Sequence, residues 1–259
     1  MTLVSGKLER AMRGLTGKRI ILTGGASGIG RTAALRLAEE GCIVGLFDLN
    51  EAGARETAEQ CVGGQAMAFK VDIADRAQVT AAMEAFERDR GPTDGLANIA
   101  GWDTPVPFLD TDEAFWEKVI RINLHGPMMM HHVVVRGMAA RGSGRVVNVA
   151  SDAGRVGSSG EAVYSACKGG IIAFTKTLAR ELARKGVTLN ALCPGPTDTP
   201  LFENFTTGTN LGDALARAIP LRRIGKPDDY AGMIAFLLSD DSAYMTGQTI
   251  SVSGGLTMV

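Results

Sequence analysis

Residues 19–41, RIILTGGASGIGRTAALRLAEEG, decide the fold of this chain. The apolar run at 19–23 predicts a buried strand, the glycine-rich stretch at 23–30 a tight turn, and residues 31–40 a helix. Glycines let the backbone approach a pyrophosphate, whose charge is favoured at the amino end of a helix. The spacing G-x-x-x-G-x-G differs from the familiar dinucleotide pattern G-x-G-x-x-G. Its position between a strand and a helix is what favours nucleotide binding.

The alternation of short apolar runs and amphipathic stretches continues along the chain. Nearly continuous apolar runs are typical of parallel strands covered on both faces. Helices are predicted at about 112–138, 162–185 and 228–239, where apolar residues recur every three or four positions. We therefore expect a single-domain α/β fold with a doubly wound parallel sheet. The further strands are predicted at 42–47, 66–71, 95–100, 145–150, 187–193 and 249–253.

The predicted domain, residues 15–259, follows a polar leader at 1–14 and is interrupted near its end. Residues 199–226 contain TTGTN, proline and glycine and break the strand–helix rhythm. A long interruption inside a compact domain is typically a lid or a binding loop. We predict that this segment covers a substrate.

Composition and charge disfavour several classes of function. The net charge is −1, from 27 basic and 28 acidic residues, which gives no electrostatic case for a nucleic-acid or membrane-surface partner. The four cysteines lack C-x-x-C spacing and suit a reducing compartment. The chain has neither a signal-peptide core nor an apolar run of about 18 residues, so we expect a cytoplasmic protein. His131 and His132 point in different directions on a helix, so no metal site is predicted.

Polar residues gather where the predicted strands end. Asp48 ends the second strand, where a carboxylate accepts hydrogen bonds from an adenosine ribose and repels a 2′-phosphate. The alternative is that Asp48 caps the helix starting near Asn50. No arginine or lysine stands beside Asp48 or within 24–30, which favours NAD over NADP. Asp72, Asn98, Ser151 and Pro194-Gly195 end or follow other strands, at the edge where open α/β sheets bind ligands.

A tyrosine and a lysine lie four positions apart in YSACK, residues 164–168, on one face of a predicted helix. A hydride leaves a secondary alcohol only if the hydroxyl proton is removed, and a tyrosine with a pKa of about 10 is a poor base. A cation about 4 Å away contributes on the order of the ~4 kcal/mol that lowers this pKa by roughly three units. We expect Lys168 to make Tyr164 a general base, while Ser151 donates a hydrogen bond to the substrate oxygen.

The glycine motif, the turn at 98–101, Asn123, Ser151, Tyr164-x-x-x-Lys168 and PGPTDT at 194–199 resemble the short-chain dehydrogenase/reductase family over about residues 15–258. The resemblance implies a Rossmann-type fold, NAD as cofactor, and a homotetramer built through the helices at 112–138 and 162–185. It also implies that Asn123 holds a water in a proton relay and acts with Ser151, Tyr164 and Lys168 in catalysis. The predicted nucleotide contacts are Gly24, Ser27, Gly28, Ile29, Gly30, Asp48, Leu49, Asp72, Ile73, Asn98, Ala100, Gly101, Tyr164, Lys168, Pro194, Gly195, Thr197 and Thr199.

The substrate pocket is predicted from the loops after Gly101 and Ser151 and from residues 199–226, with Trp102, Arg155 and Ser158 as contacts. GWD, SDAGRVGSSGEAVY, CPGPTDT and SVSGGLTM resemble the 2-hydroxycyclohexanecarboxyl-CoA dehydrogenases of the family. That similarity implies oxidation of a ring hydroxyl beta to a coenzyme A thioester. The alternatives are a 3-oxoacyl-carrier-protein reductase and a general cyclic-alcohol or sugar dehydrogenase. A nucleotide-sensing module without catalysis is disfavoured, because all four catalytic positions are retained.

Overall fold

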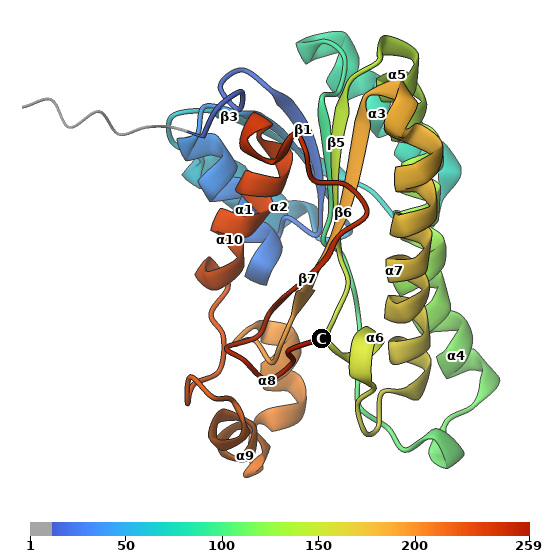
Figure 1. The fold of residues 1–259 in the computed structure, drawn as a ribbon, viewed down its shortest axis with the longest axis vertical. Helices are drawn as coiled ribbons and strands as arrows, with labels where there is room; N and C mark the ends of the chain where they lie inside the picture. The colour runs from blue at the N-terminus through green and yellow to red at the C-terminus, as the bar shows by residue number, and fades with distance from the viewer. Residues whose placement is uncertain (1–11) are drawn as a thin grey trace, which may run out of the picture.

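The structure, a computed structural model, describes residues 12–259, so most of the predicted leader lies outside the described residues. Seven parallel strands form one sheet in the order β3-β2-β1-β4-β5-β6-β7 (Figure 1). β1 pairs with both β2 and β4, so the strand order reverses beside it and a crevice opens at the carboxyl ends. The predicted doubly wound α/β fold is confirmed. The strands are β1 (Arg19–Thr23), β2 (Ile43–Asp48), β3 (Gln65–Lys70), β4 (Gly95–Asn98), β5 (Gly144–Val149), β6 (Val187–Pro194) and β7 (Thr249–Val252).

The end of β4 differs most from the sequence prediction, which continued this strand to residue 100. The backbone N–H groups of Ile99 and Ala100 donate to Thr23 Oγ1, at 3.0 and 3.2 Å, instead of to a neighbouring strand. A side chain at the end of β1 thus turns the chain away after Asn98. The following loop therefore starts directly above the crevice.

Helices cover both faces of the sheet and enclose two apolar cores (Figure 1). On one face α1 packs against α2 and α10, and on the other α3 packs against α5. Tyr230 and Leu37 are fully buried in the first core, and Phe86 and Met130 in the second. These helices are α1 (Gly28–Glu39), α2 (Glu51–Gln60), α3 (Arg76–Arg90), α5 (Gly126–Arg141), α7 (Ala162–Leu182) and α10 (Asp228–Leu238).

The helix predicted at 112–138 is divided by a π-helical turn. It consists of α4 (Glu113–Ile120), the five-residue π turn Arg121–His125, and α5. Asn123 lies fully buried in this turn. Single π turns inside α-helices occur frequently at functional sites, and periodicity does not reveal them because the apolar stripe continues through the extra residue.

The interrupted segment at 199–226 contains two short helices, α8 (Pro200–Thr206) and α9 (Leu211–Ala218), which extend beyond the carboxyl edge of the sheet (Figure 1). The short helix α6 (Ala153–Val156) lies at the same end of the molecule.

All four cysteines are free thiols. No helix within residues 12–259 combines the length and apolarity that crossing a membrane requires. Short 3-10 turns complete the structure at Phe108–Asp110, Ala183–Lys185 and Asp240–Ser242.

Phe86 provides a test of the second core. Its ring is fully buried and meets Phe69 edge to face at 6.3 Å, so Phe86→Ala is expected to lower the free energy of unfolding by ~3–5 kcal/mol. Urea denaturation followed by circular dichroism measures the change. Leu109→Ala is the control, because a side chain that is 94% exposed should change stability by less than about 0.5 kcal/mol. Equal losses in the two variants would contradict this account of the core.

Candidate active site

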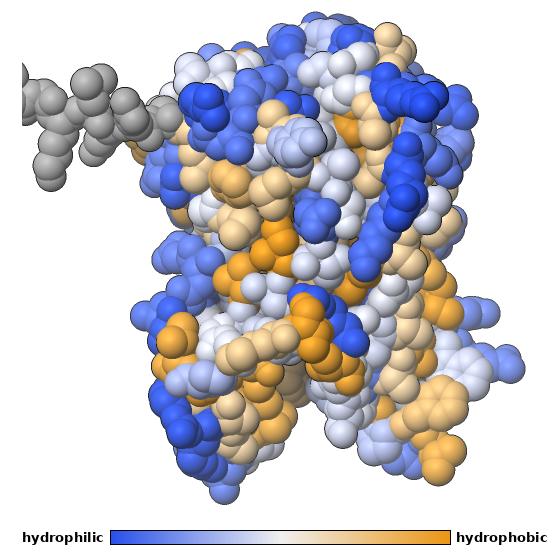
Figure 2. Space-filling view, in the orientation of Figure 1, coloured by the Kyte–Doolittle hydropathy of each residue, from blue (hydrophilic) through white to orange (hydrophobic). Residues whose placement is uncertain are grey.

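A cleft of about 900 Å³ opens at the carboxyl edge of the sheet. The surface is hollowed between the α8–α9 segment and α6, and apolar side chains gather over α8 and α9 (Figure 2). Two predicted substrate contacts, Trp102 and Ser158, line the cleft together with Ser151, Tyr164 and Lys168. The predicted nucleotide contacts that line it are Gly24, Ser27, Gly28, Ile29, Gly30, Asp48, Leu49, Asp72, Ile73, Ala100, Gly101, Pro194, Gly195, Thr197 and Thr199.

The glycine loop forms an anion-binding end of the cleft. A Cβ at Gly30 would collide with the carbonyl oxygen of Gly24, whose own φ is +78°. Within the described chain, Ser27 makes no side-chain cap to α1, and the first turn of α1 carries no acidic residue. The first amide groups of this helix therefore remain available to an anion. These residues fit the pyrophosphate of a dinucleotide.

Asp48 lies at the end of β2 and holds the glycine loop in place. Its Oδ2 accepts a hydrogen bond from Ala26 N at 3.0 Å, and its Oδ1 accepts one from Asn50 N at 2.8 Å. Helix α2 is capped instead by the Asn50 side chain, which accepts from Gly53 N, so the alternative role of Asp48 as the helix cap is wrong. Each carboxylate oxygen keeps a further lone pair for a ribose hydroxyl.

Arg31, one residue beyond the glycine loop, is a cation that the sequence analysis did not weigh. Its guanidinium donates to Ala26 O at 2.8 Å and forms an ion pair with Glu56 at 3.1 Å. The arginine is therefore already bound on two sides.

Tyr164 and Lys168 project from the first turns of α7 toward the cleft. Lys168 is buried, and its Nζ donates to Val149 O at 2.9 Å while lying 5.4 Å from the centre of the Tyr164 ring. Burial lowers the pKa of Lys168 to about 8. The ammonium group thus lies over the tyrosine ring and within reach of a ligand in the cleft.

The pKa of Tyr164 is raised, not lowered as the sequence analysis expected. Burial is the main cause, and the nearby carboxyl groups of Asp103 and Glu161 add to it, whereas a hydrogen bond with the Ser151 side chain acts in the opposite direction. The expectation of a lowered pKa is therefore wrong for the protein by itself, because burial and the two acidic neighbours outweigh the effect of Ser151. In this state the tyrosine retains its proton at neutral pH.

Ser151 follows β5 and lies beside Tyr164. Its Oγ accepts a hydrogen bond from Ala153 N at 3.1 Å at the start of α6. This contact fixes the side chain close enough to Tyr164 to act on the pKa of the phenol. Ser151 therefore caps a turn and also faces the cleft.

Asn123 does not line the cleft but clamps the loop after β4. Its Nδ2 donates to Trp102 O at 2.7 Å and to Val119 O at 3.0 Å, and its Oδ1 accepts from Trp102 N at 3.1 Å. The π turn places this side chain against the Trp102 backbone. The predicted role of Asn123 in holding a relay water remains a prediction, and the structure shows a positioning role.

Two other predicted site residues do not line the cleft. Asn98 is buried in a network with Asn148 and His131, at 3.0 and 3.3 Å. Arg155, expected to meet an anionic substrate, donates to Ser251 Oγ at 2.7 Å. Both side chains satisfy groups of the scaffold.

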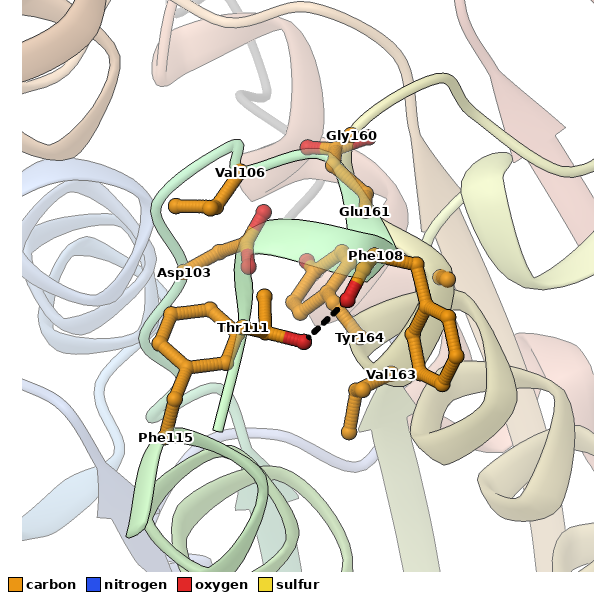
Figure 3. A pocket seen from close by; sticks show the side chains of 10 residues that line it. Asp103, Val106, Phe108, Thr111, Phe115, Gly160, Glu161, Val163 and Tyr164 are labelled. Carbon is orange, nitrogen blue, oxygen red and sulfur yellow. Dashed lines mark hydrogen bonds between the residues drawn. The ribbon is translucent and has the colours of Figure 1, made fainter. Parts of the chain in front are cut away.

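Several residues that the sequence analysis did not single out line the cleft. Asp103 and Glu161 are acidic residues close to Tyr164 (Figure 3). Both lie in loops that were predicted to form the substrate pocket, but no periodicity or motif shows which residues of a loop point inward. Apolar residues from the 199–226 segment and the C-terminus complete this wall: Leu201, Phe202, Phe205, Leu211, Leu215 and Leu256.

Known proteins resemble the chain over nearly its whole length. A family model described as enoyl-(acyl carrier protein) reductase matches residues 24–257. A 3-oxoacyl-[acyl-carrier-protein] reductase from Thermotoga maritima is 37% identical, covering 94% of this chain and 99% of the relative. A human (3R)-3-hydroxyacyl-CoA dehydrogenase is 34% identical, covering 92% and 95%. The crystal structure of levodione reductase superimposes with a TM-score of 0.88 and 32% identity, covering 93% of this chain and 97% of that chain.

Gly30→Ala tests the anion-binding end of the cleft. The added Cβ would meet backbone, which cannot rotate away, so the variant is expected to weaken nucleotide binding at least about tenfold. Isothermal titration with NAD measures this. Gly232→Ala in α10 is the matched control, because the nearest atom to its added Cβ is the end of the Arg36 side chain, at 3.8 Å. Unchanged binding in Gly30→Ala would exclude the glycine loop as the pyrophosphate site.

Proposed function

This chain belongs to the short-chain dehydrogenase/reductase family, and we propose that it oxidises a secondary alcohol with NAD, most specifically the ring hydroxyl of a cyclic β-hydroxyacyl-CoA such as 2-hydroxycyclohexanecarboxyl-CoA. The observation that carries the proposal is the meeting of the Ser151 hydroxyl, the Tyr164 phenol and the Lys168 ammonium on a wall of the cleft that also contains the glycine loop. Relatives named for acyl-carrier-protein and coenzyme A thioesters support the substrate class.

The shape and polarity of the cleft favour a ring-bearing acyl group. Phe202, Phe205 and Leu215 of the 199–226 segment line the cleft, as do Trp102 and Pro105 from the loop after β4. Apolar walls with a few polar groups are typical of small-molecule sites. A cyclohexane ring would bury its methylene groups here, each worth ~0.8 kcal/mol.

The chemistry divides between the chain and a bound nucleotide. Bound NAD would supply the hydride acceptor and a positive charge beside the phenol. Tyr164 first releases its own proton to solvent, and its phenolate then accepts the hydroxyl proton as the C–O bond becomes a carbonyl. Ser151 donates a hydrogen bond to the same oxygen and stabilises its developing charge. Lys168 adds positive charge near the phenol and has donors left for a ribose hydroxyl.

NAD is the proposed cofactor because Asp48 places a negative charge where a 2′-phosphate would lie. Arg31, the nearby cation, is already paired with Glu56 and so offers little compensation for the charge of a 2′-phosphate.

A 3-oxoacyl-carrier-protein reductase is the second candidate, favoured by the 37% identity to the Thermotoga maritima enzyme.

A homotetramer is proposed through α4–α5 and α7, supported by the exposed Ile120 and Met128 on the first of these surfaces.

Steady-state assays decide the substrate class. NAD reduction should be fastest with cyclic β-hydroxyacyl-CoA thioesters, and the matching alcohols without a thioester should have kcat/KM values lower by at least about tenfold. Equal rates with and without the coenzyme A group would exclude the thioester assignment and favour a general cyclic-alcohol dehydrogenase.

Tyr164→Phe, which removes the proton acceptor, should lower kcat at least about 100-fold while leaving NAD binding intact. Retained turnover in this variant would exclude Tyr164 as the base.

Asp48→Asn tests the choice of nucleotide. The wild-type protein should favour NAD over NADP in kcat/KM by roughly 100-fold, from repulsion between the Asp48 carboxylate and the 2′-phosphate. Asparagine removes the charge and keeps one acceptor for the glycine loop, so the NAD/NADP ratio should fall. A wild-type preference for NADP would contradict the assignment of NAD.

A further inference from the structure

A buried carboxyl group beside the catalytic tyrosine has no role in the proposed hydride transfer. Asp103 follows Trp102 in the loop after β4 and is only 6% exposed. Its Oδ2 is buried and makes no hydrogen bond with any group in the described chain. The residue lines the cleft, and its carboxyl group is turned toward Glu161 and Tyr164 (Figure 3). An unpartnered buried carboxyl group is costly for stability, so it indicates a functional constraint.

Glu161 places a second carboxyl group against the first. It is half-buried at the start of α7 and lies close enough to Asp103 to raise the pKa of that carboxyl group. Two backbone bonds fix this position: Val106 N donates to Gly160 O at 2.8 Å, and Ser165 N donates to Glu161 O at 2.7 Å. The two acidic loops on either side of the substrate region are therefore held together.

The two carboxyl groups bring negative charge to the region around Tyr164. Burial and the neighbouring Glu161 raise the pKa of Asp103 to about 8, while the backbone N–H of Thr104 and the more distant Lys168 act in the opposite direction. The negative charge of the pair reaches the reaction centre, because both groups raise the pKa of Tyr164.

Cations that would neutralise a substrate carboxylate do not face this region. Among the described residues that line the cleft, Lys168 is the one cation, and it is bound to Val149 O. Arg155 is turned to Ser251, which in turn hydrogen-bonds to Asp152. A free acid would therefore add negative charge to a site whose described lining contains no cation besides Lys168.

We propose that Asp103 and Glu161 are specificity-determining residues that admit a β-hydroxyacyl group as an uncharged thioester or ester and exclude the corresponding free carboxylate. The carbinol oxygen must lie within about 3 Å of the Tyr164 hydroxyl to react. The carboxyl carbon of a β-hydroxy acid is two bonds from the carbinol carbon, so its charge lies close to the pair. Repulsion between unit charges about 6 Å apart at an effective dielectric near 20 corresponds to roughly 100-fold in affinity.

The test compares methyl 2-hydroxycyclohexanecarboxylate with 2-hydroxycyclohexanecarboxylate at pH 7 in the presence of NAD. The ester should exceed the acid in kcat/KM by roughly 100-fold in the wild-type protein. The double variant Asp103→Asn/Glu161→Gln keeps the side-chain shapes and removes the charge, so this ratio should fall at least about tenfold. Because this ratio compares two substrates of the same protein, a general loss of activity in the variant does not alter it.

Asp110→Asn/Glu113→Gln is the matched control, because it makes the same chemical change at exposed positions outside the cleft. If the double variant does not fold, Glu161→Gln alone, at a half-buried position, should lower the ratio in the same direction. Equal kcat/KM for ester and acid in the wild type, or a ratio unchanged in a folded variant of the pair, overturns the inference.

The inference rests on the proposed oxidation of β-hydroxyacyl groups. The assays distinguish a failure of the role of Asp103 and Glu161 from a failure of the proposed function. Turnover of coenzyme A thioester, ester and acid alike would keep the proposed function and remove the role of the pair. Failure of every thioester and ester, with turnover of plain alcohols only, would remove both.

Discussion

The pairing of β1 with β2 on one side and β4 on the other is the constraint on which the rest of the structure depends. Parallel strands send all their carboxyl ends to one edge, and the reversal of strand order beside β1 opens a crevice there. The glycine loop follows β1, Asp48 ends β2, and Ser151 follows β5, so three distant parts of the chain meet. The close approach of Gly24 and Gly30 then fixes the first turn of α1 as one end of the cleft.

The surroundings of Tyr164 show why its proton affinity depends on the state of the cleft. Burial and two acidic neighbours favour the neutral phenol in the protein by itself. A ligand that brings positive charge and displaces water changes this balance, because electrostatic interactions strengthen in a drier site. Lys168 contributes by keeping an ammonium group close to the ring although its own pKa is lowered by burial. Tyrosine and lysine are therefore best understood as parts of a site completed by its ligand.

The sequence was sufficient for the strands and for most of the residues that line the cleft near the glycine loop, because both depend on local patterns. Apolar runs, glycine spacing and the position of Asp48 after β2 are local, and the structure differs mainly at the end of β4, where Thr23 diverts the chain. Side-chain direction in the loops is not local. Arg155 turns to Ser251 and Asn123 clamps Trp102 because of partners distant in sequence. Asp103 lines the cleft, although no local pattern distinguishes it from the other residues of its loop. Spacing alone also gave the wrong sign for the pKa shift of Tyr164, since it omits burial and the acidic residues.

The cleft has opposite electrostatic character at its two ends. At the glycine loop, uncapped amide groups at the start of α1 favour an anion. At the catalytic end, the lining contains Asp103, Glu161 and apolar side chains from the 199–226 segment. A dinucleotide with an anionic pyrophosphate and a cationic ring would therefore have one favourable direction of binding. Asn123 contributes to the acidic end of the cleft, because its hydrogen bonds to the Trp102 backbone position the adjacent Asp103 beside Tyr164.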